Sequence, residues 1–154
     1  MKTLMLALMA WGVAGVAQAQ DWIPIVFARD VVIGLDFDDL RRDGGMVTIS
    51  QSAVYASRQM LPSGAVYDYA TSRERYDCVN ERTSTLVSSV YQIGRNEPVI
   101  RAQGSHDDWQ YIAPGTFGQR ILKTVCDDPR PETFAIPSAE EFARVSRTLF
   151  LHVE

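Results

Sequence analysis

The stretch that most constrains the fold is residues 109–126, WQYIAPGTFGQRILKTVC. Thr116 and Gln119 are spaced as a capping box, a pair whose hydroxyl and amide satisfy backbone N–H groups at a helix start. Apolar residues then recur at helical spacing, at Phe117, Ile121, Leu122 and Val125. A helix with one apolar stripe needs a flat apolar partner. The stretch therefore predicts a helix that lies across a sheet and carries Cys126 in its last turn.

Segments before this helix have the patterns of strands. Residues 46–55 alternate, with Val47 and Ile49 on one face and Ser50 on the other, which is typical of an antiparallel strand with a packed face and a wetter face. Residues 58–70 are poorly patterned and predict a loop with some strand at its end. The predicted strands are residues 22–27, 31–37, 46–55, 72–79, 82–93 and 98–102. The expected fold class is α+β: a single antiparallel β-sheet of about six strands, one C-terminal helix packed across it, and a short appended helix.

The appended helix is predicted in the segment that follows Cys126. The proline-rich run DDPRP, residues 127–131, ends the first helix and forms a spacer. Ser138 and Glu141 are spaced as a second capping box, and Phe142, Val145 and Leu149 follow at helical spacing. We expect an amphipathic helix over residues 139–149 that packs on its own sheet, with binding to a partner as the alternative.

The first 19 residues have the three parts of a secretory signal peptide. Lys2 is a positive n-region, residues 4–16 are an apolar run, and Ala17-Gln18-Ala19 has the small-x-small form of a cleavage site. The apolar run is shorter than the roughly 20 residues that cross a bilayer, although a membrane anchor or a buried helix is the alternative. The predicted division is residues 1–19 signal peptide, 20–126 folded domain and 127–154 C-terminal extension. No cysteine follows the cleavage site to accept a lipid, so we expect an exported chain without a transmembrane segment.

The clusters of ionisable residues give little support for catalysis or metal binding. The carboxylates of Asp36, Asp38 and Asp39 could ligate Ca²⁺ or Mg²⁺, but alternation puts Asp39 on the opposite face from the other two, which favours a polar strand end. His106, followed by two aspartates, has only its neighbour Ser105 as a nearby nucleophile, without a strained elbow. We therefore name no catalytic residue, no metal ligand and no cofactor. The net charge of −4 argues against nucleic acid as the partner.

Arginines and tryptophans are the remaining candidates for binding. Arg73 and Arg75 lie on one side of a predicted strand, so a basic strip there could bind an anionic sugar or an acidic partner loop, or pair with the chain's own carboxylates. The set is Arg73, Arg75, Arg82, Arg95 and Arg101. Trp22 and Trp109 are expected to be core or core-edge aromatics. The ligand-binding residues are left unassigned.

Cys78 and Cys126 are the only cysteines of the chain. An even count in an exported protein favours a disulfide bond between them. Two buried free thiols, or half of a metal site completed by His106 and His152, are the alternatives, although no zinc-finger spacing is present. A Cys-His nucleophile has no supporting signature.

Several sequence blocks together resemble the surface-adhesin protein E family over residues 21–126. These blocks are Trp22, LRRDG at 40–44, YDCVN at 76–80 with Arg82, Trp109, IAPGT at 112–116 and Val125-Cys126. The resemblance implies a non-enzymatic binding protein of a Gram-negative bacterium, in the periplasm or on the outer cell surface. It also implies protein partners, including host matrix and plasma proteins such as vitronectin and laminin, and a homodimer. Fold does not fix function, so two alternatives are kept: a periplasmic structural or envelope-assembly factor, and a hydrolase that uses His106.

Overall fold

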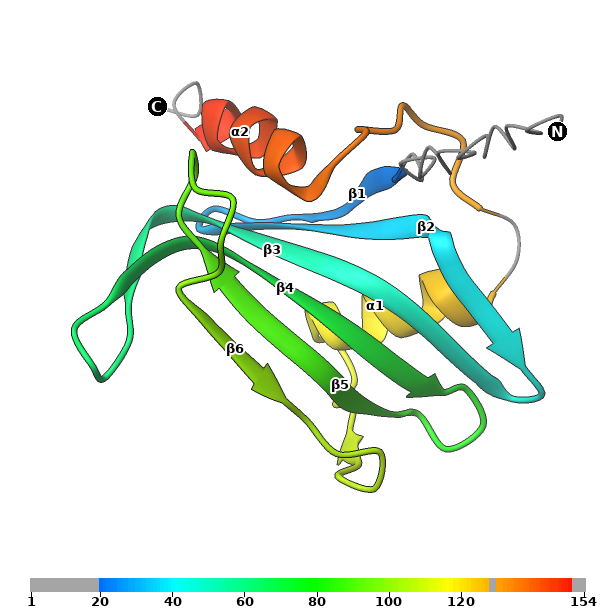
Figure 1. Cartoon of the computed structure of the whole chain (residues 1–154). Helices are drawn as coiled ribbons and strands as arrows, with labels where there is room; N and C mark the ends of the chain where they lie inside the picture. Colours follow the sequence, from blue (N-terminus) through cyan, green and yellow to red (C-terminus); the bar gives the residue numbers. More distant parts are fainter. Residues whose placement is uncertain (1–19, 128–129, 151–154) are drawn as a thin grey trace, which may run out of the picture.

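The computed structural model describes residues 20–127 and 130–150. The predicted signal peptide and His152 lie outside the described residues. Figure 1 shows the arrangement of the described elements. The strands are β1 (Trp22–Phe27), β2 (Val31–Asp43), β3 (Met46–Met60), β4 (Val66–Asp77), β5 (Arg82–Tyr91), β6 (Ile100–Gln103) and β7 (Gln110–Tyr111). The helices are α1 (Phe117–Cys126) and α2 (Ala139–Phe150).

The strands form one antiparallel sheet in the order of the chain, from β1 to β6, and β7 pairs with the start of β5. The predicted α+β class is confirmed. Residues 58–70 contain the predicted loop with strand at its end, but the loop is shorter than predicted, because β3 continues to Met60 and β4 begins at Val66. Gly64, at φ 83°, and a hydrogen bond from Leu61 N to Ala65 O (2.8 Å) confine the reversal to residues 61–65. A register shift between Val54 and Gln59 interrupts the alternation of side chains along β3, so the sequence pattern does not indicate that the strand continues.

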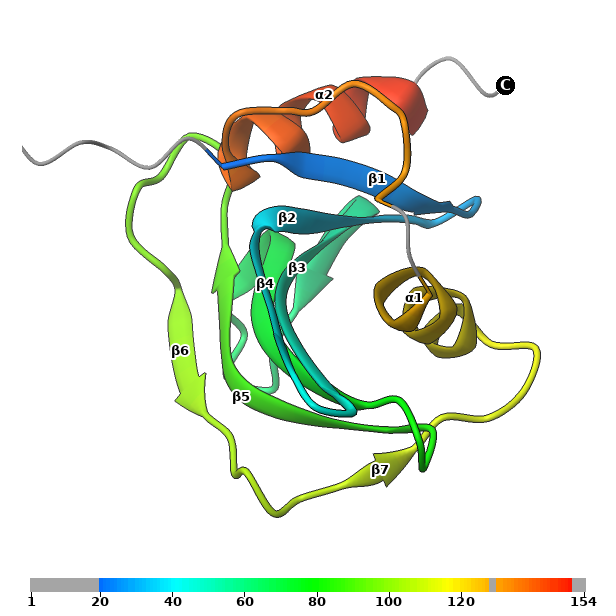
Figure 2. The same cartoon turned by 90° about the vertical axis from the view of Figure 1, so that its right-hand side faces the viewer.

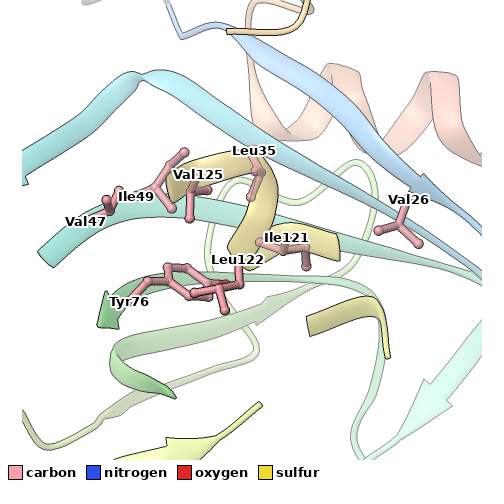
Figure 3. Close-up of a cluster of buried hydrophobic side chains, with 8 residues drawn as sticks. All are labelled: Val26, Leu35, Val47, Ile49, Tyr76, Ile121, Leu122 and Val125. Atoms are coloured by element: carbon pink, nitrogen blue, oxygen red, sulfur yellow. The ribbon is translucent and has the colours of Figure 1, made fainter. Parts of the chain in front are cut away.

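The sheet curves around α1, which lies against its concave face (Figure 2). Thr116 Oγ1 accepts the Gln119 N–H at 3.3 Å, and Gln119 Oε1 accepts the Gly115 N–H at 2.8 Å, so the predicted cap forms. The core on this face packs α1 against the strands of the sheet (Figure 3). It consists of Val26, Leu35, Val47, Ile49, Tyr76, Ile121, Leu122 and Val125. Ile121, Leu122 and Val125 of the predicted stripe therefore pack on the sheet, whereas Phe117 at the start of the helix is 48% exposed.

A disulfide bond fixes the end of α1 to the sheet. Cys78 directly follows β4 and Cys126 is the last residue of α1, and their sulfurs are 2.06 Å apart. The bond joins positions 48 residues apart in the sequence, so it closes a long loop that contains β5, β6 and β7. With each sulfur bonded to the other, neither cysteine is a free thiol or a metal ligand in this structure.

The helix α2 lies on the opposite side of the sheet from α1, which we call the outer face (Figure 2). Its Phe142 is fully buried, and a second core forms there from Trp22, Val32, Val54, Tyr69, Ile136, Phe142 and Ala143. On the way to α2 the chain pairs with β1, since Trp22 and Ile136 exchange two backbone hydrogen bonds of 3.0 Å. The expectation that this helix packs on its own sheet is confirmed. Among the described residues, neither helix has the length and apolar character needed to cross a membrane.

A candidate binding groove on the outer face of the sheet

The outer face is open beside α2, and the strand register determines which side chains lie on it. Residues paired across antiparallel strands point to the same face. One such row runs from Ser52 through Thr71 and Ser89 to Arg101, and the next row contains Ser50, Arg73 and Val87. Hydroxyl and guanidinium groups from β3, β4, β5 and β6 therefore gather on one surface.

These rows form the floor of a groove of about 550 Å³ that is open to solvent. The turn after β5 contributes Arg95 and Asn96 to one wall, and the first turn of α2 contributes Glu140 to another. Tyr69 and Tyr91 also line it, with their rings stacked at 5.1 Å between centroids and 12° between planes. We call this the arginine groove, after the residues Arg73, Arg95 and Arg101 that line it.

Two of the three arginines in the groove have no partner within the described part of the chain. Arg73 Nη1 donates to both oxygens of Asp39, at 2.8 and 2.7 Å. The side chains of Arg95 and Arg101 are exposed and make no hydrogen bond or ion pair with any described residue. The one acidic residue of the lining, Glu140, is bonded to Arg144 at 2.7 Å. The groove is therefore locally positive within an acidic chain.

The tyrosine pair closes the end of the groove that meets α2. Tyr69 is buried, and burial, followed by the nearby charge of Glu140, raises the pKa of its phenol to about 12. Tyr69 is therefore a neutral hydroxyl at physiological pH. Tyr91 is half-buried. The rings contribute an apolar wall to a site whose floor is polar.

A second hollow, of about 580 Å³, adjoins the arginine groove and shares Ser50 and Arg73 with it. Asp36, Asp38 and Asp39 all line this acidic hollow. The prediction that alternation separates Asp39 from Asp36 is wrong. A register shift in β2 between Asp36 and Arg41 interrupts the alternation. The side chain of Asp39 consequently reaches Ser50 and Arg73 on the outer face.

The carboxylates of the acidic hollow have structural roles. Asp36 is 3% exposed and accepts the backbone N–H groups of Asp21 at 3.0 Å and Asp38 at 3.2 Å. Burial, the largest cause, raises the pKa of its carboxyl above the usual value, and the two N–H bonds oppose that shift. Asp39 holds Arg73 and accepts the Ser50 hydroxyl at 2.6 Å. No group of three or more potential metal ligands is found among residues 20–127 and 130–150.

The half-buried Trp109 marks the opposite end of the outer face. Its ring lies under the guanidinium carbons of Arg82 at 4.6 Å and Arg75 at 5.6 Å. Arg82 pairs in register with Tyr111, which is 80% exposed, and the adjoining turn carries Val79, which is 78% exposed. We call Val79, Arg82, Trp109 and Tyr111 the Trp109 patch. Arg73 and Arg75 do share this face, as predicted, but only Arg73 reaches the groove.

His106 is exposed and makes no hydrogen bond or ion pair with any described residue. It lines a small hollow of about 240 Å³ together with Arg41 and Arg75. Ser105 Oγ is not bonded to the imidazole and instead accepts the Asp107 N–H at 3.2 Å. The structure brings no nucleophile to the imidazole within the described residues.

The sequence points to the arginines of the groove but not to the residues that surround them there. Arg95 and Arg101 lie ten residues or fewer after β5 in the chain, yet only the pairing of β6 with β5 places Arg101 beside Ser89. Thr71 and Ser89 also line the groove, although no sequence motif singles them out. The alternation of Val87, Ser89 and Tyr91 along β5 was the available signal, since it places all three on one face.

The comparisons with known proteins agree with this fold. The family model for surface-adhesin protein E matches residues 22–127. No curated protein matches the sequence significantly. Crystal form II of Haemophilus influenzae protein E is 12% identical, covering 78% of this chain and 96% of that chain, with a TM-score of 0.50. Protein E from non-typeable Haemophilus influenzae is also 12% identical, covering 77% of this chain and 82% of that chain, with a TM-score of 0.44. The match over 22–127 spans most of the sequence, and the chain belongs to the surface-adhesin protein E family.

Proposed function

We propose that this protein is an exported, non-enzymatic adhesin of a Gram-negative bacterium that binds protein partners through the Trp109 patch. Family membership supports an adhesin. The observation that carries the choice of surface is the exposure of Tyr111, which pairs with Arg82 of the Trp109–Arg82 stack, and of Val79 in the turn that leads to Arg82. Tryptophan, tyrosine and arginine are the residues that most often dominate the energy of protein interfaces.

The chemistry of the described residues favours binding over catalysis. The carboxylates that could serve as acid or base are engaged elsewhere: Asp39 holds Arg73, and Asp77 holds the turn after β4. His106 makes no hydrogen bond with a hydroxyl among the described residues, and its neighbour Ser105 Oγ accepts the Asp107 N–H instead. The hydrolase alternative therefore has no observation in its favour, and replacing His106 by Ala should leave binding phenotypes unchanged.

The proposed partners are host matrix and plasma proteins such as vitronectin and laminin. We expect the chain from Gln20 onward to bind them when they are immobilised, and Val79→Ala with Tyr111→Ala to weaken that binding at least tenfold. Both side chains are highly exposed, so the fold should survive. Phe27→Ala with Met60→Ala removes two other exposed apolar residues, away from the patch, and serves as the control. Equal loss in both double variants would contradict the patch, and no binding by the unmodified chain would contradict the adhesin function.

The compartment is proposed on the same basis. We propose that residues 1–19 are a signal peptide, that 20–126 form the adhesin domain, and that 127–154 are an extension. The alternative of a periplasmic assembly factor is favoured by one observation: both cysteines are used in the disulfide, so neither can be acylated. Protease added to intact cells should degrade the protein if it faces outward. Protection until lysis would place it in the periplasm and favour the alternative.

The proposed homodimer has a direct test. Sedimentation of the purified chain over a range of concentrations should give the mass of two copies. A single copy at every concentration would contradict the dimer and leave the binding proposal standing, since the patch lies on one chain.

A further inference from the structure

We propose that the arginine groove is a binding site for an acidic saccharide, a sugar that carries carboxylate or sulfate groups. The site shares no residue with the Trp109 patch. The proposal therefore goes beyond the protein-binding function and does not depend on it. Its volume of about 550 Å³ lies within the range of small-ligand sites.

The charges of the groove select an anion. Arg95 and Arg101 present guanidinium groups that no described carboxylate neutralises, and Arg73 is engaged through one nitrogen only. A guanidinium group binds carboxylate and sulfate through paired N–H donors, which gives both strength and orientation. Asp39 and Ser50 preset the Arg73 side chain, so less conformational entropy is lost when a ligand binds.

The floor of the groove selects a polyhydroxylated molecule. The hydroxyls of Thr71 and Ser89 make no hydrogen bond to any described residue. The Asn96 amide of the groove wall likewise has no such partner. Hydroxyl and amide groups can both donate and accept hydrogen bonds, which matches the hydroxyls of a sugar. The ring of Tyr91 adds an apolar wall against which the C–H face of a sugar can pack.

The position of the groove disfavours an acidic peptide. Extended peptides bind by adding a strand to an open sheet edge, where unpaired backbone groups are available. Most of the groove lies over β3, β4 and β5, which are flanked by neighbouring strands on both sides, and the edge strand β6 contributes only Arg101. A ligand there must be recognised through side chains. The acidic hollow next to Arg73 repels an anion and directs it toward Arg95 and Arg101.

Titration calorimetry of the chain from Gln20 onward tests the proposal with three defined probes. They are a sulfated heparin tetrasaccharide, its fully desulfated and N-acetylated form, which keeps only the carboxylates as charges, and maltotetraose, which is neutral. We expect saturable binding of the sulfated probe that weakens as salt is raised. Binding of the desulfated probe as well would show that carboxylates suffice, and binding of the sulfated probe alone would show that sulfate is required; either supports an acidic saccharide. No binding of either charged probe, or equal binding of maltotetraose, would overturn the proposal.

A charge-matched pair of variants locates the site. Arg95→Ala with Arg101→Ala should weaken binding at least tenfold, and Thr71→Val should weaken it less. Arg29→Ala with Arg120→Ala removes the same charge from exposed positions away from the groove and should leave affinity within about twofold. Equal losses in the two double variants would show nonspecific attraction and overturn the site. Circular dichroism of each variant confirms that the comparison is between folded proteins.

Discussion

Gly34 of β2 lies directly beneath the buried ring of Phe142 of α2. A Cβ atom added to Gly34 would lie 2.4 Å from Phe142 Cζ, closer than any real contact. Phe142 is fully buried, so its ring has no free space into which to move. Because Gly34 has no side chain, α2 in the extension after Cys126 can approach the sheet closely enough for Phe142 to pack on β2.

The Gly34–Phe142 contact predicts a strong coupling in a double-mutant cycle. Gly34→Ala should destabilise the fold by about 1–3 kcal/mol through overpacking, and Phe142→Ala by about 3–5 kcal/mol through the cavity it leaves. In the Phe142→Ala background, Gly34→Ala should cost much less, because the added methyl enters that cavity. Urea unfolding of the four proteins measures the coupling. Additive effects would contradict the contact.

Loss of the disulfide should destabilise the protein without changing its topology. The bond closes a loop that spans β5 to β7, and such bonds contribute about 2–4 kcal/mol, chiefly through the unfolded chain. Cys78→Ala with Cys126→Ala should lower the free energy of unfolding by that amount. A reducing agent should lower the stability of the unmodified chain equally and leave the double variant unaffected. Thiols that react fully in the native protein would contradict the bond.

Asp77 should make the protein sensitive to acid. Its carboxylate, 1% exposed, accepts hydrogen bonds from the Asn80 side chain, from backbone N–H groups of the turn and from Arg82. These bonds, led by the one from the Asn80 side chain, lower the pKa of Asp77 to about 2 from the usual 3.8. A lowered folded-state pKa stabilises the fold above pH 3.8, and this contribution is lost as the pH falls toward 2.

Asp77→Asn tests this dependence. The variant should be less stable than the unmodified protein at pH 7, and the gap should narrow between pH 4 and pH 2. Asp107→Asn, on an exposed loop, is the control and should follow the unmodified protein throughout. Denaturant unfolding at several pH values measures both. A gap that stays constant down to pH 2 would show that the carboxylate of Asp77 contributes no acid sensitivity.

Asp68 should be needed to hold α2 on the outer face. This buried carboxylate accepts the Ile93 N–H at 3.0 Å and contacts Arg58 at 3.2 Å and Arg147 of α2 at 3.3 Å. Asp68→Ala should destabilise the fold by about 1–3 kcal/mol, because a buried N–H loses its acceptor. In the Asp68→Ala variant, hydrogen exchange should show faster opening of α2 than of α1. Equal protection of the two helices would contradict this role.

Local patterns in the sequence specified the elements and their faces. Val47 and Ile49 alternate with Ser50, and the structure places them against α1 while Ser50 lies on the outer face. The cap at Thr116 and the stripe ending at Val125 specified α1. These features could be predicted because they depend on neighbours in the chain.

Features that depend on long-range register could not be predicted from the sequence. The shift in β2 that moves Asp39 to the face of Asp36 exists only relative to β3. The groove likewise requires the pairing of β4, β5 and β6, which aligns Arg73 and Arg101 in adjacent rows. Bulges add a residue without a local sequence signal, so alternation assigns the wrong face beyond them.

The backbone pairing of Ile136 with Trp22 limits how copies of this chain could join into one larger sheet. A sheet has two borders with unpaired backbone groups, and both must be open for strand pairing to propagate into a fibre. On the β1 border Ile136 occupies the position beside Trp22, and Pro24 has no N–H to donate. Within the described part of the chain, the border at β6 is left open and is four residues long. The bridge at Trp22 and the missing N–H of Pro24 therefore disfavour strand pairing at the β1 border, so association that begins at β6 is not readily extended beyond two chains.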